Sequence, residues 1–286
     1  MAVVNTNIGA SVAQAALMRN ERALNTAMEQ LSTGKKINSA GDNASGLAIS
    51  TRLTSQIRGL DTAIRNANDA MSMVNTAEGA LDEITAMMQR MRELAVQSGT
   101  GTTSAADRTY LNSEYVALRN EIDRIADNTQ WNGRNILDGS AGASVGKSTV
   151  AFQVGVNQNQ TISTTFGNVN NTTGHMSALA STRLSAATIA SAVTVASNAI
   201  TRLDNTISDV SAQRATFGAI SNRLTHAVDN LTNVKTNTEA SRSRILDTDY
   251  AAATSELART QIIQQAGTAM LAQANQLPQT VLALLQ

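Results

Sequence analysis

The sequence predicts a mainly α protein, built as a long antiparallel helical bundle or coiled coil with a small β-hairpin insert. Three observations lead to this prediction. Apolar residues recur every three or four positions over long stretches, the single proline is Pro278, and a period of two appears only within residues 129–180. Because proline interrupts helices, a chain almost free of it can form long ones. The two periods then separate helical segments from strands.

The composition favours packed helices and argues against several classes of function. Only 2% of the 286 residues are aromatic, and the 22 basic and 22 acidic residues cancel. The chain therefore lacks the net positive charge typical of proteins that bind nucleic acid or an anionic membrane. It has no cysteine, which excludes disulfides and thiolate nucleophiles. No stretch approaches the roughly 18 apolar residues of a membrane span, and we expect no cleavable signal peptide.

Heptad spacing predicts three central helices. The first extends from about Asn43 to Ser98-Gly99, and the second follows a capping box at residues 103–107. The third begins near Ile189. We call the heptad positions that pack against a neighbouring helix the seam, and in this helix several seam positions are polar or charged: Arg214, Ser221 and Lys235. These apolar stripes can be buried only against one another, so we expect a long, narrow bundle.

Two further helices are predicted at the ends of the chain, over about Asn5–Leu31 and Tyr250–Leu285. A polar break at residues 241–244 (Ser-Arg-Ser-Arg) is expected before the second. Such weakly apolar helices are marginal alone in water, so we expect them to be poorly ordered in the free chain and to fold on association. Their large apolar residues are sparse: Ile8, Val12, Leu17, Leu24, Met28, Leu31, Leu257, Ile263, Met270 and Leu277.

The insert has the pattern of a β-hairpin. Apolar and polar residues alternate over 150–156 and again over 162–166, and the polar segment Asn157–Gln160 turns the chain between them. Asn132-Gly133 and Asp138-Gly139 predict turns ahead of this hairpin.

No catalytic, cofactor or metal site is predicted. His175 and His226 lie far apart without a cluster of partner residues, and the motifs of zinc peptidases, serine hydrolases and P-loop nucleotide-binding proteins do not occur. Met71, Met88 and Met91 lie at seam positions, where methionine fills space in a packed core. The sequence therefore predicts a protein that is not an enzyme.

Segments near both ends resemble bacterial flagellins. They are residues 37–46 (INSAGDNASG), 89–98 (QRMRELAVQS) and 274–282 (ANQLPQTVL), and the resemblance covers about residues 1–140 and 180–286 in the same order. Asn43 replaces an aspartate common in the family, a change that keeps the polar turn chemistry.

The resemblance implies a secreted, extracellular subunit that polymerises with itself into the flagellar filament for swimming. It implies that residues 1–43 and 241–286 form an inner coiled-coil domain, that 44–138 and 181–240 form a helical shell, and that 139–180 form a short variable outer segment. The ten apolar residues of the terminal helices would be the polymerisation residues. The implied partners are other copies of the chain, the type III export apparatus, an export chaperone and the filament cap.

Arg90, Leu94 and Glu114 allow two interpretations. They can belong to an exposed helix face on which Arg90 pairs with Glu93, three residues away. The resemblance also implies a surface that contacts neighbouring subunits and that an innate-immune receptor of an animal host recognises in the free monomer.

Three alternative functions remain open from the sequence alone. A hook–filament junction protein has similar terminal helices but assembles to a limited size. A filament with an embedded enzyme would need a larger insert with catalytic residues. A secreted coiled-coil adhesin would lack the matched terminal motifs.

Overall fold

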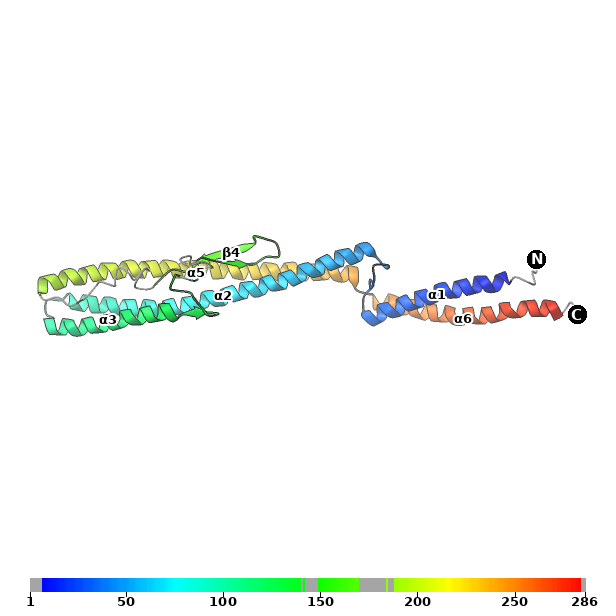
Figure 1. The fold of residues 1–286 in the computed structure, drawn as a ribbon, viewed down its shortest axis with the longest axis horizontal. Helices are drawn as coiled ribbons and strands as arrows, with labels where there is room; N and C mark the ends of the chain where they lie inside the picture. The colour runs from blue at the N-terminus through cyan, green and yellow to red at the C-terminus, as the bar shows by residue number, and fades with distance from the viewer. Residues whose placement is uncertain (1–6, 140, 142–148, 170–183, 185–187, 284–286) are drawn as a thin grey trace. The chain divides into compact units, whose positions relative to one another are not determined.

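The computed structural model describes residues 7–139, 141, 149–169, 184 and 188–283, and within helices it leaves out the side chains of Ile189 and residues 277–283. The chain divides into two compact units. Unit 1 combines Met1–Ile57 with Thr236–Gln286, and unit 2 comprises Arg58–Lys235. Figure 1 shows the helices of both units. The predicted mainly α fold is confirmed, and each unit is described separately below.

Unit 2 is a bundle of three helices, α2 (Ala44–Ser98), α3 (Ala105–Asn128) and α5 (Ile189–Leu246), in which α2 runs antiparallel to both α3 and α5 (Figure 1). Helix α2 begins in unit 1 and helix α5 ends there. The predicted seams meet in one core, so the predicted bundle is confirmed. Its fully buried large side chains include Leu81, Ile84, Met88 and Met91 of α2, Tyr115 and Ile122 of α3, and Leu203 and Phe217 of α5.

The ends of the central helices are satisfied by local polar contacts. The predicted capping box is present at α3, where Ser104 Oγ accepts from Asp107 N and the Asp107 carboxylate accepts from Ser104 N. At the start of α2, Asn43 Oδ1 accepts a hydrogen bond from Gly46 N. The Asn43 amide therefore caps the start of α2.

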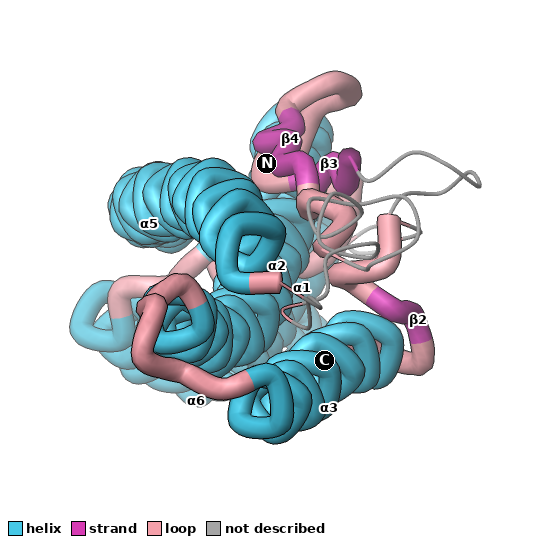
Figure 2. The backbone as a smooth tube through the Cα atoms, turned by 90° about the vertical axis from the view of Figure 1, so that its left-hand side faces the viewer, coloured by secondary structure: helices cyan, strands magenta, loops and turns pink. Residues whose placement is uncertain are grey.

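The β-hairpin lies on the outside of the unit 2 helices (Figure 2). It pairs β3 (Thr149–Gln153) with β4 (Thr161–Thr165), as the alternating pattern predicts. A second, smaller hairpin, β1 (Gln130–Trp131) and β2 (Arg134–Asn135), was not predicted. It surrounds the predicted Asn132-Gly133 turn, in which both residues have positive φ, 50° and 74°.

Two side-chain amides attach the larger hairpin to the helices. Asn66 Nδ2 of α2 donates to Gln153 O at 3.1 Å, and Gln213 Nε2 of α5 donates to Thr165 O at 2.7 Å. Phe152 and Ile162 face the core, and Thr165 lies on the exposed face. The hairpin is therefore part of the unit 2 fold.

Unit 1 contains α1 (Ile8–Thr33) and α6 (Tyr250–Ala283). Asn7 caps the start of α1 by accepting from Ala10 N, and Gly34, with φ 70°, ends the helix. The two chain segments that connect to these helices pair with each other, because Lys36 N donates to Leu246 O and Thr248 N donates to Gly34 O. The segment after α1 and the segment before α6 thus form a single antiparallel β-bridge between Lys35 and Asp247.

The predicted break at residues 241–244 is wrong, because α5 continues through them to Leu246. Serine and arginine are tolerated in helices, and Ser241 Oγ donates to the carbonyl of Asn237 within the helix. The actual break is Asp247–Asp249, where Asp249 Oδ1 accepts from Ala251 N and Ala252 N at the start of α6. Carboxylate caps mark this boundary better than the polar run does.

Candidate assembly surface

The terminal helices α1 and α6 pair antiparallel through a narrow seam. Asn7 Nδ2 donates to Ala274 O at 2.9 Å near the start of α1, and Asn20 Nδ2 donates to Thr260 O at 2.8 Å near its middle. Buried or half-buried residues recur at alternating spacings of three and four on both helices, which is heptad spacing. They are Ala10, Ala13, Leu17, Asn20, Leu24, Ala27 and Leu31 on α1, and Ala253, Leu257, Thr260, Gln264, Gly267, Leu271 and Ala274 on α6.

This seam consists mainly of small and polar residues. Its most buried members are Asn20, Ala27, Ala253 and Thr260. Its large apolar residues, such as Leu17 and Leu257, are only half-buried. The pair therefore buries little apolar area compared with the core of unit 2.

Most large apolar residues outside the seam remain exposed. Their exposed fractions run from 47% for Ile263 to 66% for Ile262. Scattered exposed apolar residues are ordinary, but a series along two paired helices is typical of a surface that another protein covers. The residues are Ile8, Val12, Met18, Met28, Ile262, Ile263 and Met270, and we name this set the open apolar surface.

Nine of the ten predicted polymerisation residues therefore fall into two groups. The seam holds Leu17, Leu24, Leu31 and Leu257, and the open apolar surface holds Ile8, Val12, Met28, Ile263 and Met270. Leu277 lies in α6 but its side chain is outside the described residues. The prediction selected large apolar residues and missed Asn20, Thr260 and Gly267, although the three-four spacing around Leu17 and Leu24 places Asn20 on the seam.

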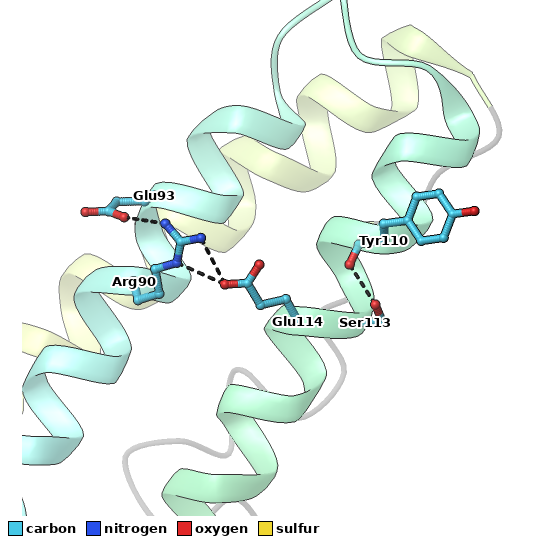
Figure 3. A network of polar contacts seen from close by, with 5 residues as sticks. All are labelled: Arg90, Glu93, Tyr110, Ser113 and Glu114. Atoms are coloured by element: carbon cyan, nitrogen blue, oxygen red, sulfur yellow. Dashed lines mark hydrogen bonds and ion pairs between the residues drawn. The ribbon is translucent and has the colours of Figure 1, made fainter.

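A polar network on unit 2 joins two of the residues predicted for subunit contact or receptor recognition. Arg90 Nη2 lies 2.9 Å from Glu114 Oε1, and Arg90 Nη1 lies 2.9 Å from Glu93 Oε2 (Figure 3). The Arg90 guanidinium donates hydrogen bonds to the carboxylates of Glu93 and Glu114, and these bonds, the one to Glu93 most, raise its pKa. The predicted Arg90–Glu93 pair is confirmed. Leu94, by contrast, is 1% exposed and packs in the core.

The charged residues at seam positions of α5 are paired with acidic residues of α2. Arg214 Nε lies 2.8 Å from Glu78 Oε1, and Lys235 Nζ lies 2.6 Å from Asp61 Oδ1. The hydrogen bond to Glu78 is the main cause that raises the pKa of Arg214. Because these pairs are partly exposed, they contribute little stability but favour one alignment of α2 with α5.

Nothing in the described part of the chain resembles a catalytic or metal centre. No group of three histidine or acidic side chains there could hold a metal ion, and His226 is exposed on α5. His175 lies outside the described residues. A shallow depression of unit 2 is lined by Val96, Val193 and Ile200 with glycine, alanine, serine and threonine, none of them titratable. Within the described residues, no helix is both long and apolar enough to span a membrane.

The fold and the open apolar surface define a class of protein: a helical structural subunit whose paired ends are built to associate. Family comparison makes this class specific. Residues 4–142 match the bacterial flagellin N-terminal helical region, and residues 200–285 match the bacterial flagellin C-terminal helical region. The chain therefore belongs to the bacterial flagellin family, as the terminal motifs predict.

Relatives extend this similarity over the whole chain. A flagellin of Halalkalibacterium halodurans is 44% identical over 284 residues, covering 99% of this chain and 100% of the relative. Flagellin A of Vibrio cholerae is 37% identical, covering 99% of each chain. This similarity supports a flagellar filament subunit and does not favour the hook–filament junction protein.

A solved structure is similar in fold. The structure of a candidate flagellar hook-associated protein from Vibrio parahaemolyticus aligns with a TM-score of 0.59 at 13% identity, covering 72% of this chain and all of the other. At this level of identity the likeness concerns the fold alone.

Proposed function

We propose that the chain polymerises with copies of itself into the extracellular flagellar filament, and that the open apolar surface of α1 and α6 is the surface that other copies cover. The observation that carries this proposal is the contrast within one helix pair. The seam between α1 and α6 uses small and polar residues, whereas Ile262, Met270 and other large apolar residues face solvent.

Simple energetics support assembly through many weak contacts. Complete burial of a large apolar side chain contributes about 1.5–3 kcal/mol. Ordering of each residue opposes this by about 1–2 kcal/mol of backbone entropy. Terminal helices with a weak seam can therefore gain most of their stability when another copy covers the open apolar surface. We therefore expect α1 and α6 to pair only transiently in the free chain and to become stably ordered when other copies cover them.

Family membership supports the remaining partners in this proposal. We propose that the chain reaches the exterior through the type III export apparatus with an export chaperone, and that the filament cap directs its addition. The absence of cysteine is compatible with passage of an unfolded chain, since no disulfide can form before export.

The proposal of host receptor recognition concerns a different surface, on unit 2. Arg90 and Glu114 are exposed and can be contacted directly, whereas buried Leu94 would act by holding α2 in place. Purified monomer applied to cells that carry an innate-immune receptor reporter tests this proposal. A response that Arg90→Ala weakens is expected, and no response to the unmodified monomer would refute it.

Removal of residues 250–286 tests the assembly proposal. The truncated chain is expected to keep the helical signal of unit 2 and to form no filaments by sedimentation and electron microscopy, while the full chain extends filament seeds. Normal filaments from the truncated chain would contradict the proposal. Short assemblies of limited size from the full chain would instead favour a junction protein.

A further inference from the structure

We infer that Gly267 of α6 is a socket for Leu17 of α1, and that this contact sets the register in which the terminal helices pair. A Cβ atom added at Gly267 would lie 2.6 Å from Cδ2 of Leu17 and 3.1 Å from its Cγ. Carbon atoms that are not bonded do not approach to 2.6 Å, so any side chain at position 267 would displace Leu17. The close approach depends on the missing Cβ.

The place of Gly267 in the helix supports this role. It lies inside the 34-residue helix α6, where glycine is the least favourable residue after proline, and α6 contains no other glycine. Not every helical glycine in the chain makes such a contact. A Cβ added at Gly79 of α2 or Gly218 of α5 would meet nothing within 4 Å. Gly267 thus differs from these two glycines, because a neighbouring side chain occupies the space where its Cβ would lie.

A shift of the two helices by one heptad of seven residues would remove the socket. Leu17 would then lie opposite Thr260 or Ala274, and both of these have a side chain in the space that Leu17 needs. The hydrogen bonds from Asn7 to Ala274 O and from Asn20 to Thr260 O are made in the same register. Three contacts along the pair therefore agree on one alignment.

This arrangement separates two tasks between two sets of residues. Shape and directed hydrogen bonds select the alignment of α1 with α6, as small or polar seam residues do in other coiled coils. The open apolar surface supplies the apolar area that other copies of the chain would cover. The second statement rests on the proposed function, whereas the socket and the register do not.

Because the natural chain has no cysteine, an introduced pair can report the register. Asn7→Cys and Ala274→Cys place thiols at two positions whose residues are joined by a hydrogen bond of 2.9 Å in this register. The rate of intramolecular disulfide formation is measured on the dilute full-length chain under oxidising conditions. Adding Gly267→Ala is expected to slow this rate about tenfold, because the new methyl group overpacks against Leu17.

Two further variants distinguish the socket from a general effect of replacing a helical glycine with alanine. Leu17→Ala combined with Gly267→Ala is expected to bring the rate back to within about threefold of the unmodified background, since the smaller side chain no longer meets the methyl group. Gly218→Ala, a matched change in open space, is expected to leave the rate unchanged.

Three results would overturn the inference: no disulfide in the unmodified background, an unchanged rate with Gly267→Ala, or effects of the Leu17 and Gly267 changes that simply add. Sedimentation of the same samples measures polymerisation separately. A chain that forms the disulfide but no polymer would contradict the proposed function and leave the register inference standing.

Discussion

The side-chain amide of Asn20 donates a 2.8 Å hydrogen bond to the backbone carbonyl of Thr260, joining positions 240 residues apart in the chain. The two residues are only 9% and 2% exposed. A buried amide without a partner is unfavourable, so this bond favours the one alignment that satisfies it. The terminal helices are thus a specific pair despite their weak apolar stripes.

Asn20→Ala is expected to weaken the pairing of α1 and α6 by about 1 kcal/mol, the usual net contribution of one hydrogen bond. Amide hydrogen exchange by mass spectrometry would show faster exchange in peptides from residues 8–33 and 250–276. Gln14→Ala, at an exposed position of the same helix, is the control and should leave exchange unchanged. Equal effects of the two changes would contradict a role for the Asn20 bond.

Met270→Glu is expected to raise the protein concentration needed for polymerisation by about tenfold or more, because a carboxylate cannot be buried at low cost in an apolar contact. Met270 is 65% exposed in the single chain, so the helical circular dichroism signal of the free chain should not change. Sedimentation of seeded reactions measures the effect. Gln261→Glu adds the same charge at an exposed polar position of α6 and should polymerise nearly normally if the open apolar surface is the contact.

Arg108→Met is expected to destabilise unit 2 by about 2–4 kcal/mol, since it leaves the buried carbonyl of Ser98 without its donor. The Arg108 side chain is 1% exposed. Its Nε donates to the carbonyl of Ser98, the last residue of α2, and its Nη2 donates to the carbonyl of Thr100, just after the helix. Urea unfolding followed by circular dichroism measures the change. Arg124→Met removes an exposed pair with Glu121 on its own helix and should change stability by less than about 0.5 kcal/mol.

Two glycine-to-alanine changes are expected to act in opposite directions. A Cβ at Gly59 of α2 would lie 2.7 Å from Cγ1 of Val156, so Gly59→Ala should lower the free energy of unfolding by about 1 kcal/mol. Gly218→Ala of α5 meets nothing and should raise it by about 0.5–1 kcal/mol through helix propensity. Thermal unfolding of both variants measures whether each change lowers or raises the free energy of unfolding. A gain in both would mean that Val156 moves aside freely.

Tyr115 should make stability fall at alkaline pH. Its side chain is fully buried, its hydroxyl has no hydrogen-bond partner among the described residues, and burial raises its pKa to about 12, against the opposing charges of Arg119 and Arg202. In the unfolded chain the phenol loses its proton near pH 10, so the unfolded state binds fewer protons between pH 10 and 12. Stability therefore falls as pH rises through this window.

Tyr115→Phe removes both the titration and the unpartnered hydroxyl. The variant should be as stable as the natural chain at neutral pH, or more stable by up to about 1 kcal/mol, and should lose less stability above pH 10. Urea unfolding at pH 7 and pH 11 measures both effects. Tyr110→Phe, at an exposed position of the same helix, serves as the control. A loss of several kcal/mol in Tyr115→Phe at neutral pH would indicate a partner for the hydroxyl.

The long helices could be predicted because periodicity and capping are local properties. The heptad seam predicts both ends of α2 to within a residue or two, and the Ser104–Asp107 box predicts the start of α3. The end of α5 could not be predicted in the same way, because Ser241 and Arg244 are polar yet tolerated in a helix. The β1–β2 hairpin was missed because strands of two residues have no measurable period.

The two helices of the candidate assembly surface were predicted from the sequence, but not which of their residues are buried in the seam and which are exposed. The large apolar residues predicted α1 and α6 as the assembling helices. The alternating spacing of three and four residues could also have placed Asn20 and Gly267 on the seam. The sequence alone did not predict which side chains are buried, because burial depends on the partner helix. Leu94 illustrates this limit, since only packing against the other helices of unit 2 turns it from a surface residue into a core residue.

The sequence by itself determined the class of fold, the family and the presence of two terminal helices, because these follow from local spacing and from motifs. The tertiary structure alone decided the division of those helices into a seam and an open apolar surface. Pairing is a non-local event: whether Leu17 lies in a socket or Met270 faces solvent depends on how α1 and α6 align. That alignment depends on a glycine and two asparagines, residues whose effect is visible only when their partners are in place.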